Sequence, residues 1–350
     1  MKLSIIHKVA LTSILLMLIS VSVVGVLFFN KTTELLVEHI LDDVADAVQD
    51  AGSRLQSIIN TQKEDVLFLA STPPIQGMIR VRSTNIDVLD QSTLSQWKQR
   101  LKTIFRSQLQ RKKSYLSIRY INENGRELVT VIRENAIIKS VEDSQLQNKS
   151  KRNYVKSAMQ LSSGLVYISE INLNREFGKV SLPHQEVLRT ATPVFDKRNG
   201  KRAGLVVITA EIGGKLREIQ QRAQYKSQNV ILITNDHGGY LLHPDESKTY
   251  GFDLGKQYRI QEDLPYVAKL YLPDNKTSQL ILLPEHTDNT EVVNFTKITF
   301  DDARADRFIA VAVIQDLAKI ASEESKVLTE VASWAILLTF GVVIVTIFLS

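Results

Sequence analysis

A group of polar side chains between positions 152 and 189 is the part of this 350-residue sequence best suited to chemistry. Arg189 stands in the apolar run EVLRTATP, where a buried charge requires a partner. Tyr167 and Ser169 alternate within GLVYISEINLN, so they share one face of a predicted strand. Such residues supply the fixed cations and hydrogen-bond donors that small anionic or zwitterionic ligands need. The candidate ligand-binding residues are Arg152, Tyr154, Tyr167, Ser169, Asn172, Asn174 and Arg189.

A purely structural role for these residues stays open at this point. Arg189 would then pair with Glu170 or Glu176 in a buried network, and the two asparagines would cap a turn. Arg119 also falls within a predicted strand, and it fits this structural role better than a ligand-binding role.

Other kinds of chemistry find little support in the sequence. The chain has no cysteine, which excludes disulfides, thiolate metal sites and cysteine nucleophiles. It has no G-x-x-x-x-G-K-[ST], H-E-x-x-H or G-x-S-x-G motif, so we predict no catalytic residues and no cofactor. His237 and His243 belong to one predicted hairpin without enough converging ligands, so we predict no metal site. The net charge of +5 is spread along the chain, which argues against a nucleic-acid surface.

Two apolar segments bracket the rest of the sequence. Residues 9–29 and 331–350 are uncharged and, at about 1.5 Å per residue, long enough to cross a hydrocarbon core of about 30 Å. Lys2 and Lys8 place residues 1–8 in the cytoplasm by the positive-inside rule, so residues 30–330 would lie outside the cell. A cleaved signal peptide is the competing interpretation of the first segment. The predicted protein is a two-pass protein of the bacterial inner membrane, in contact with lipid.

The region between these segments changes from helical to strand periodicity. Apolar residues recur every three or four positions over residues 30–72, which predicts a long stalk helix that ends before Pro73 and Pro74. Further helices are predicted at 75–113, 144–161 and 215–223. Alternating segments separated by Asn, Asp and Gly turns predict an α+β fold with antiparallel sheets. The predicted strands lie within 115–125, 126–135, 164–174, 186–196, 201–212, 229–244, 278–283, 292–299 and 307–313.

Two ordered strings carry a family resemblance, SYLSIRYINENGRELVTVIREN and LQNKSKRNYVKSAMQLSSGLVYISEINLNREFGKVSLPHQEVLRTATPVFDKRNGKRAGLVVI. The sequence resembles the double Cache (tandem PAS-like) periplasmic sensor of bacterial histidine kinases and diguanylate cyclases, in detail over residues 68–212 and in layout elsewhere. The resemblance implies a membrane-distal ligand-binding domain at 73–214, a smaller membrane-proximal domain at 215–314, an exit helix at 315–330 and a homodimer. Thr130 stands where such sensors often carry an arginine, so no ligand identity is transferred from relatives.

The resemblance also implies a non-catalytic sensing function. The candidate residues would line or support the distal pocket, and its ligand would be a small molecule such as an amino acid or a carboxylate. Binding would signal to a cytoplasmic histidine kinase or diguanylate cyclase module that is missing from this chain. The alternative is a sensor that reads a periplasmic binding-protein partner, which predicts an exposed apolar patch and a filled distal pocket. An ectoenzyme is a third hypothesis, and turnover by the outer region would support it.

Overall fold

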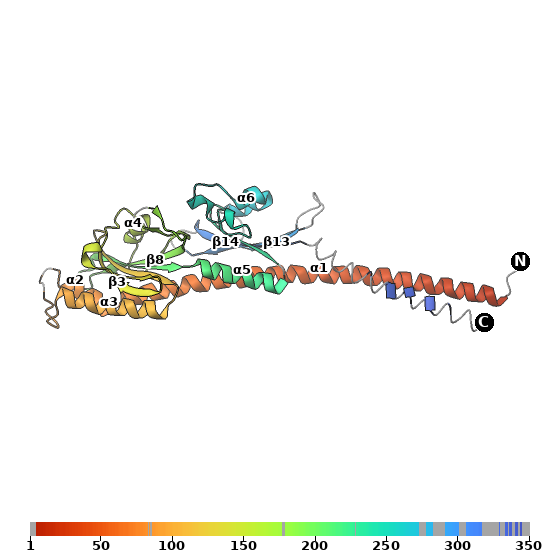
Figure 1. Ribbon diagram of the computed structural model, residues 1–350, viewed down its shortest axis with the longest axis horizontal. Helices are drawn as coiled ribbons and strands as arrows, with labels where there is room; N and C mark the ends of the chain where they lie inside the picture. The colour runs from red at the N-terminus through yellow and green to blue at the C-terminus, as the bar shows by residue number, and fades with distance from the viewer. Residues whose placement is uncertain are drawn as a thin grey trace.

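The computed structural model shows an elongated molecule in which two antiparallel sheets lie against one long helix (Figure 1). It describes residues 5–316 apart from 83, 85, 177–178, 228, 273–277, 283–290 and 301–305. Toward the C-terminus it also describes Thr329, Ser333, Trp334, Ile336, Leu337, Phe340, Gly341 and Ile344.

The long helix α1 (Ile5–Ala70) joins the predicted membrane segment and the predicted stalk without a break. Its outer half buries an apolar stripe that includes Val44, Leu55 and Ile59, as the three- and four-residue spacing predicts. Among the described residues, one helix is long and apolar enough to cross a membrane, and its apolar window is Leu15–Thr32. The helix ends shortly before α2 (Pro73–Arg80), because a proline disfavours helical geometry in the residue before it.

The second predicted membrane segment is described only in part. Its described residues are helical, and apolar side chains such as Trp334 and Phe340 are exposed. Figure 1 draws them toward the end of the molecule at which α1 begins. The exit helix cannot begin at Gln315, because strand β14 (Phe308–Asp316) extends past that residue. The rest of that predicted helix, apart from Thr329, lies outside the described residues.

The first sheet has the strand order β3-β2-β1-β9-β8-β4, with β5 also paired to β8, and each of these pairs is antiparallel. The turn after β1 contains Gly125 and the turn after β8 contains Gly200, both with positive φ, so the predicted Asn-Gly and Asp–Gly turns are confirmed. A two-stranded ribbon, β6 (Arg175–Glu176) with β7 (Lys179–Val180), is separate from this sheet. The strands of the sheet are β1 (Tyr115–Asn122), β2 (Glu127–Glu134), β3 (Ile137–Ser140), β4 (Tyr167–Ile168), β5 (Asn172–Leu173), β8 (Glu186–Phe195) and β9 (Arg202–Glu211).

One face of the first sheet packs on α2, α3 (Leu94–Arg111) and the outer end of α1. The prediction of continuous helix over 75–113 is wrong, because α2 ends at Arg80, α3 begins at Leu94, and the described residues between them are not helical. Asp87 holds this loop: its buried carboxylate accepts hydrogen bonds from the guanidinium of Arg80 and from Nε1 of Trp97. The hydrogen bonds from Arg80 lower the pKa of Asp87 to about 2.

The opposite face of the first sheet carries α4 (Asn153–Met159). This helix starts later than the predicted 144–161. Residues 147–149 are held extended against β2, since Glu127 N donates to the Gln147 carbonyl and Lys149 N donates to the Gly125 carbonyl. Within the predicted range 144–161, the helical structure before α4 is limited to a short 3-10 turn, η1 (Asp143–Gln145).

The second sheet has the order β11-β10-β14-β13-β12, and its described pairs are antiparallel. Helix α5 (Gly213–Ser227) leads from β9 into it. Its remaining strands are β10 (Val230–Asn235), β11 (Tyr240–Leu242), β12 (Ser278–Leu282) and β13 (Glu291–Thr299). Between β11 and β12 lie the short helices η2 (Glu246–Lys248), η3 (Gly251–Asp253), α6 (Ile260–Asp263) and η4 (Pro265–Tyr271).

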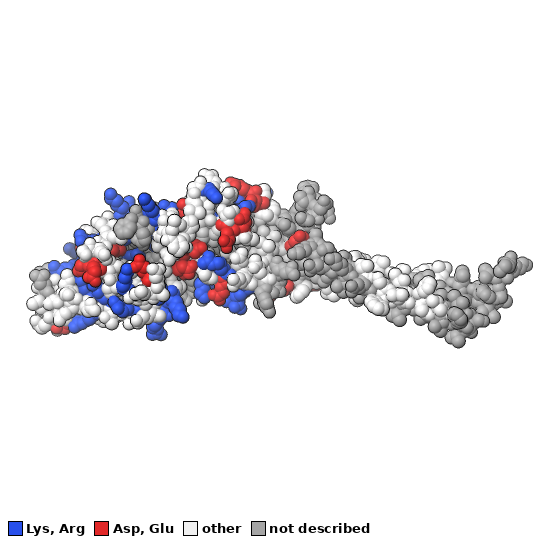
Figure 2. Space-filling view, in the orientation of Figure 1, with Lys and Arg blue, Asp and Glu red and all other residues white. Residues whose placement is uncertain are grey.

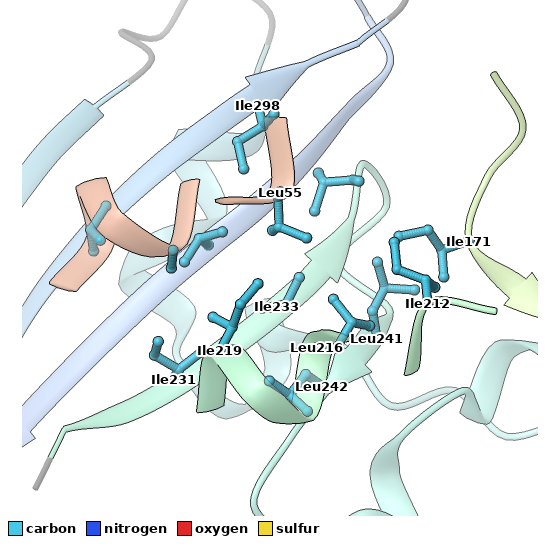
Figure 3. Close-up of a cluster of buried hydrophobic side chains, with 14 of the residues drawn as sticks. Leu55, Ile171, Ile212, Leu216, Ile219, Ile231, Ile233, Leu241, Leu242 and Ile298 are labelled. Carbon is cyan, nitrogen blue, oxygen red and sulfur yellow. The ribbon is translucent and has the colours of Figure 1, made fainter. Parts of the chain in front are cut away.

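A single buried cluster joins α1, α5 and both sheets. Figure 3 shows Leu55 of α1 and Ile298 of β13 with Leu216 of α5 and, from the first sheet's side, Ile171 and Ile212. The apolar contacts therefore continue across the junction, where the sequence predicts a boundary between two tandem domains at residues 214 and 215.

Candidate ligand-binding site

The candidate site lies on the α4 face of the first sheet. Apolar residues of β1, β8 and β9 pack there on Tyr154, Val155 and Ala158 of α4. This layer covers part of the sheet and leaves a cavity of about 320 Å³ at the side of β4 and β5. Small-molecule pockets in proteins usually enclose about 300–1,000 Å³, so the cavity is large enough for a small ligand.

The structure brings together most of the residues that the sequence singles out. Its cavity wall consists of Lys151, Arg152, Asn153, Tyr154, Tyr167, Ser169, Glu170, Asn172 and Arg189. Asn174 is the predicted site residue that does not line the cavity, and its Oδ1 accepts a hydrogen bond from Arg189. The wall therefore carries three cationic side chains, those of Lys151, Arg152 and Arg189, and one carboxylate, that of Glu170. Figure 2 shows Lys and Arg side chains gathered over the loops around α4.

Arg189 is the centre of the site. The residue is only 6% exposed, and it lies in the middle of β8. Its Nη1 donates to Oδ1 of Asn172 at 2.9 Å, and its Nη2 donates to Oδ1 of Asn174 at 3.0 Å. The guanidinium also lies 5.9 Å from the ring centre of Tyr154. Two neutral amides therefore orient the cation.

Arg119 lies on the same face of the sheet but is held by other residues. Its Nε is 3.1 Å from a carboxylate oxygen of Glu127, and its Nη1 donates to the hydroxyl of Thr209 at 3.0 Å. It does not line the cavity. These contacts agree with the structural role that the sequence favours for this residue.

The tyrosine hydroxyl above the site stays protonated. Burial raises the pKa of Tyr154 above its ordinary value, although the positive charges of Arg119, Arg189 and Arg152 oppose this shift. Arg152 is the N-cap residue of α4, which places its side chain at the rim. The wall therefore combines a protonated phenol with cations, a set suited to a carboxylate.

The segment that forms one edge of the site is not the continuous strand predicted at 164–174. It splits into β4 and β5, because the Ser169 hydroxyl accepts a hydrogen bond from Arg189 N at 2.9 Å and donates to the Glu170 carbonyl at 2.8 Å. A bulge of this kind redirects side chains at the edge of a sheet. Tyr167, Ser169 and Asn172 reach the cavity from this edge.

Two residues of the second sheet's half hold this edge from outside. Arg307 Nη1 donates to the Ile168 carbonyl at 2.7 Å, and its guanidinium lies 5.4 Å from the ring centre of Tyr167. Asp253 accepts from Leu173 N at 2.7 Å and from Arg175 at 2.9 Å. Sequence reasoning missed both residues, because they lie far from the site along the chain.

Sequence reasoning also missed three residues of the wall itself, Lys151, Asn153 and Glu170. The predicted helix over 144–161 put the first two in its middle. Their true place, at the start of α4, turns them toward the cavity. Lys151 and Asn153 flank the predicted site residue Arg152, so a correct prediction of where α4 starts would have placed both at the site.

The family model for the sensor domain of bacterial histidine kinases matches residues 76–270, more than half of the chain. The chain belongs to this family. The match spans the first sheet, the candidate site and the start of the second sheet, and it confirms the resemblance to Cache-like sensors. No curated protein matches the chain.

Solved structures of other sensor domains share the fold. A domain from Vibrio parahaemolyticus assigned to the sensory box/GGDEF family has a TM-score of 0.61 at 19% identity, covering 83% of this chain and 99% of its own. The extracellular domain vpHK1S-Z8, assigned to a histidine kinase, has a TM-score of 0.60 at 18% identity, covering 84% and 96%. The Campylobacter jejuni chemoreceptor Tlp3 sensory domain with isoleucine bound has a TM-score of 0.52 at 11% identity, covering 82% and 96%.

The α+β class, the antiparallel sheets and the long N-terminal helix are thereby confirmed for this sensor domain. Extracellular sensor domains of this family belong to membrane receptors, which implies a periplasmic location for the sheets. At these identities the likeness concerns the fold alone.

Proposed function

We propose that this sensor domain binds a small carboxylate-bearing ligand, such as an amino acid, in the cavity beside Arg189. The observation that carries the proposal is the orientation of a buried guanidinium by Asn172 and Asn174 on a wall with three cations and one carboxylate. A guanidinium can bind a carboxylate through two parallel hydrogen bonds. The isoleucine bound by the Tlp3 domain is a ligand of this chemistry on the same fold.

The route from ligand to membrane would run through the edge of the site. A ligand between α4 and β5 contacts the segment that Arg307 and Asp253 hold from the second sheet. Arg307 directly precedes β14, the strand that leads toward the second predicted membrane segment. The proposal requires that this edge have two positions, because a ligand shifts such an arrangement only by its different affinity for two states.

The proposed receptor is a two-pass homodimer. Its spans would be residues 9–29 and 331–350, and its distal and proximal domains would be residues 73–214 and 215–314. The Leu15–Thr32 window and the exposed apolar side chains near the C-terminus support this arrangement. The output would be a histidine kinase or diguanylate cyclase module in the cytoplasm.

Calorimetry with the full chain in lipid nanodiscs tests the ligand proposal. Isoleucine and isoleucine amide are a matched pair, because only the first carries a carboxylate. We expect isoleucine to bind the more tightly and Arg189→Gln to weaken it about 10- to 100-fold, the value of a charge-assisted hydrogen bond. Arg106→Gln is the control, since Arg106 is exposed on α3 at the opposite face. Equal binding of acid and amide, or equal binding by Arg189→Gln, would contradict the proposal.

An exposed apolar tip, formed by Val88 and Leu89, favours a second candidate function, the binding of a periplasmic protein. Val88 and Leu89 are 78% and 76% exposed on the loop that Asp87 holds. The open cavity does not match the filled pocket that this alternative predicts. Crosslinking of a periplasmic protein to the wild-type tip, with its loss in the double variant Val88→Ser and Leu89→Ser, would support it.

A further inference from the structure

A second cavity, of about 250 Å³, lies where the two sheets meet. Glu186 and Leu173 line it from the first sheet, Leu216 and Arg217 from α5, and Leu241 from the second sheet. Figure 3 shows Leu216 and Leu241 pointing into the cluster at this junction. The wall therefore has an apolar part made of leucines and a polar rim.

Tyr250 is the unusual residue of this wall. Its side chain is 3% exposed, and its hydroxyl has no hydrogen-bond partner among the residues that the structure describes. Buried hydroxyls are normally hydrogen-bonded, because an unsatisfied one loses its bonds to water without replacement. Tyr250 also has a left-handed backbone, with φ of 55°, which is uncommon for a residue with a bulky side chain. The unsatisfied hydroxyl and the left-handed backbone are both energetically unfavourable, and both occur in one residue that lines a cavity. Such strained residues cluster at binding sites.

The charges on the rim favour a cation. Glu186 and Glu246 supply two carboxylates, whereas Arg217 supplies one guanidinium. Arg217 Nη1 donates to Oε1 of Glu186 at 3.0 Å, so this pair largely offsets itself. The carboxylate of Glu246 then gives the wall a negative formal charge. The net charge of this wall is therefore opposite in sign to that of the cavity beside Arg189.

We propose that the junction cavity is a second ligand site, for a small organic cation with an alkyl chain, whose ammonium group donates a hydrogen bond to the Tyr250 hydroxyl. The leucines pack on the alkyl chain, and the carboxylates of the rim favour the positive charge. Leu173 belongs to β5, next to Asn172 of the first cavity, so the second site adjoins the same edge segment. The proposal does not depend on what the first cavity binds.

Butylammonium is the probe, and butyrate is its counterpart with opposite charge. Saturation-transfer NMR and calorimetry on the full chain in nanodiscs measure their binding. We expect butylammonium to bind, butyrate to bind at least about 10-fold more weakly at this cavity, and Tyr250→Phe to weaken butylammonium about 10-fold or more, since it removes one hydrogen bond to a charged group. Tyr258→Phe is the matched control, because Tyr258 is exposed and does not line the cavity.

The variants separate this site from the first cavity. Arg189→Gln should leave butylammonium binding unchanged. Tyr250→Phe should keep or raise the melting temperature, because it removes a buried hydroxyl for which the described part of the chain provides no hydrogen-bond partner. Leu216→Phe adds volume inside the cavity and should abolish binding in a chain whose circular dichroism is unchanged. Absence of butylammonium binding to the wild type, or equal affinity in Tyr250→Phe, would overturn the proposal.

Discussion

The cavity beside Arg189 and the cavity at the junction differ in how their polar groups are held. In the first, a buried cation is oriented by Asn172 and Asn174 on a single sheet face. In the second, the Tyr250 hydroxyl is buried without a described partner where α5, β11 and β5 meet. The first wall is net positive and the second is net negative at neutral pH.

One sensor domain therefore carries two cavities of opposite charge a short distance apart. A strand fixes its side chains by register: Asn172 pairs with Val187, two residues before Arg189 in β8, and so lies within hydrogen-bond distance of the Arg189 guanidinium. A junction between elements brings together residues with no common register, and a group can remain unsatisfied there until a ligand arrives. The two cavities should therefore respond differently to changes in the core, the edge and the pH.

The largest effect is expected from the core that supports the junction. Leu55 of α1 is fully buried in the cluster shown in Figure 3. Leu55→Ala removes apolar contacts and leaves a space, so we expect it to lower the free energy of unfolding by about 2–5 kcal/mol. Chemical denaturation of the chain in detergent measures this change. Leu67→Ala on the same helix is the control, since Leu67 is 36% exposed and should cost well under half as much.

Leu55→Ala should affect the two cavities unequally. Because Leu55 belongs to the same buried cluster as Leu216 and Leu241, butylammonium binding should weaken more than isoleucine binding. If the affinities for butylammonium and isoleucine fall equally, the two cavities belong to one cooperative unit and do not respond independently.

An intermediate effect is expected at the shared edge. Asp253→Ala removes the acceptor of Leu173 N and of the Arg175 side chain. A buried donor left unsatisfied costs about 1–3 kcal/mol, so the Leu173 amide should exchange at least about 10-fold faster in hydrogen–deuterium exchange. Glu218→Ala is the control, because Glu218 is exposed on α5 and pairs with Lys215. Unchanged exchange at Leu173 would mean that the second sheet does not hold this edge.

The smallest effect is a pH dependence at the junction alone. Burial lowers the pKa of His243 below its ordinary value of 6.5, with Lys248 acting in the same direction and Asp263 opposing it. The folded state therefore binds fewer protons than the unfolded chain. The stabilising effect is complete above pH 6.5 and is lost as the pH falls through the lowered pKa. Protonation also adds positive charge to the wall, so butylammonium should bind about 2- to 5-fold more weakly below that pKa.

His243→Gln should remove this pH dependence, and His237→Gln, at an exposed turn, should leave it in place. Titration of butylammonium affinity from pH 7.5 to pH 5 distinguishes them. A pH dependence that persists in His243→Gln would contradict the assignment of the effect to His243.

Much of the candidate site was predictable from the sequence. Arg189 in an apolar strand required a partner, and the asparagines fifteen to seventeen positions before it supply one. The alternation of Tyr167 and Ser169 placed both toward one cavity. The start of α4 and the bulge at Ser169 were not predictable, because each depends on hydrogen bonds to segments that are distant in the sequence.

The long helix, the hairpins and the α+β class follow from the sequence alone, since apolar periodicity and turn residues act over a few neighbouring positions. The sequence also indicates which polar residues could not be buried alone. Only the tertiary structure decided that Arg307 and Asp253 hold the edge of the first cavity, and that Tyr250 lies at a second one. The reason is that contacts between elements depend on the packing of faces, and a local pattern does not specify which faces meet.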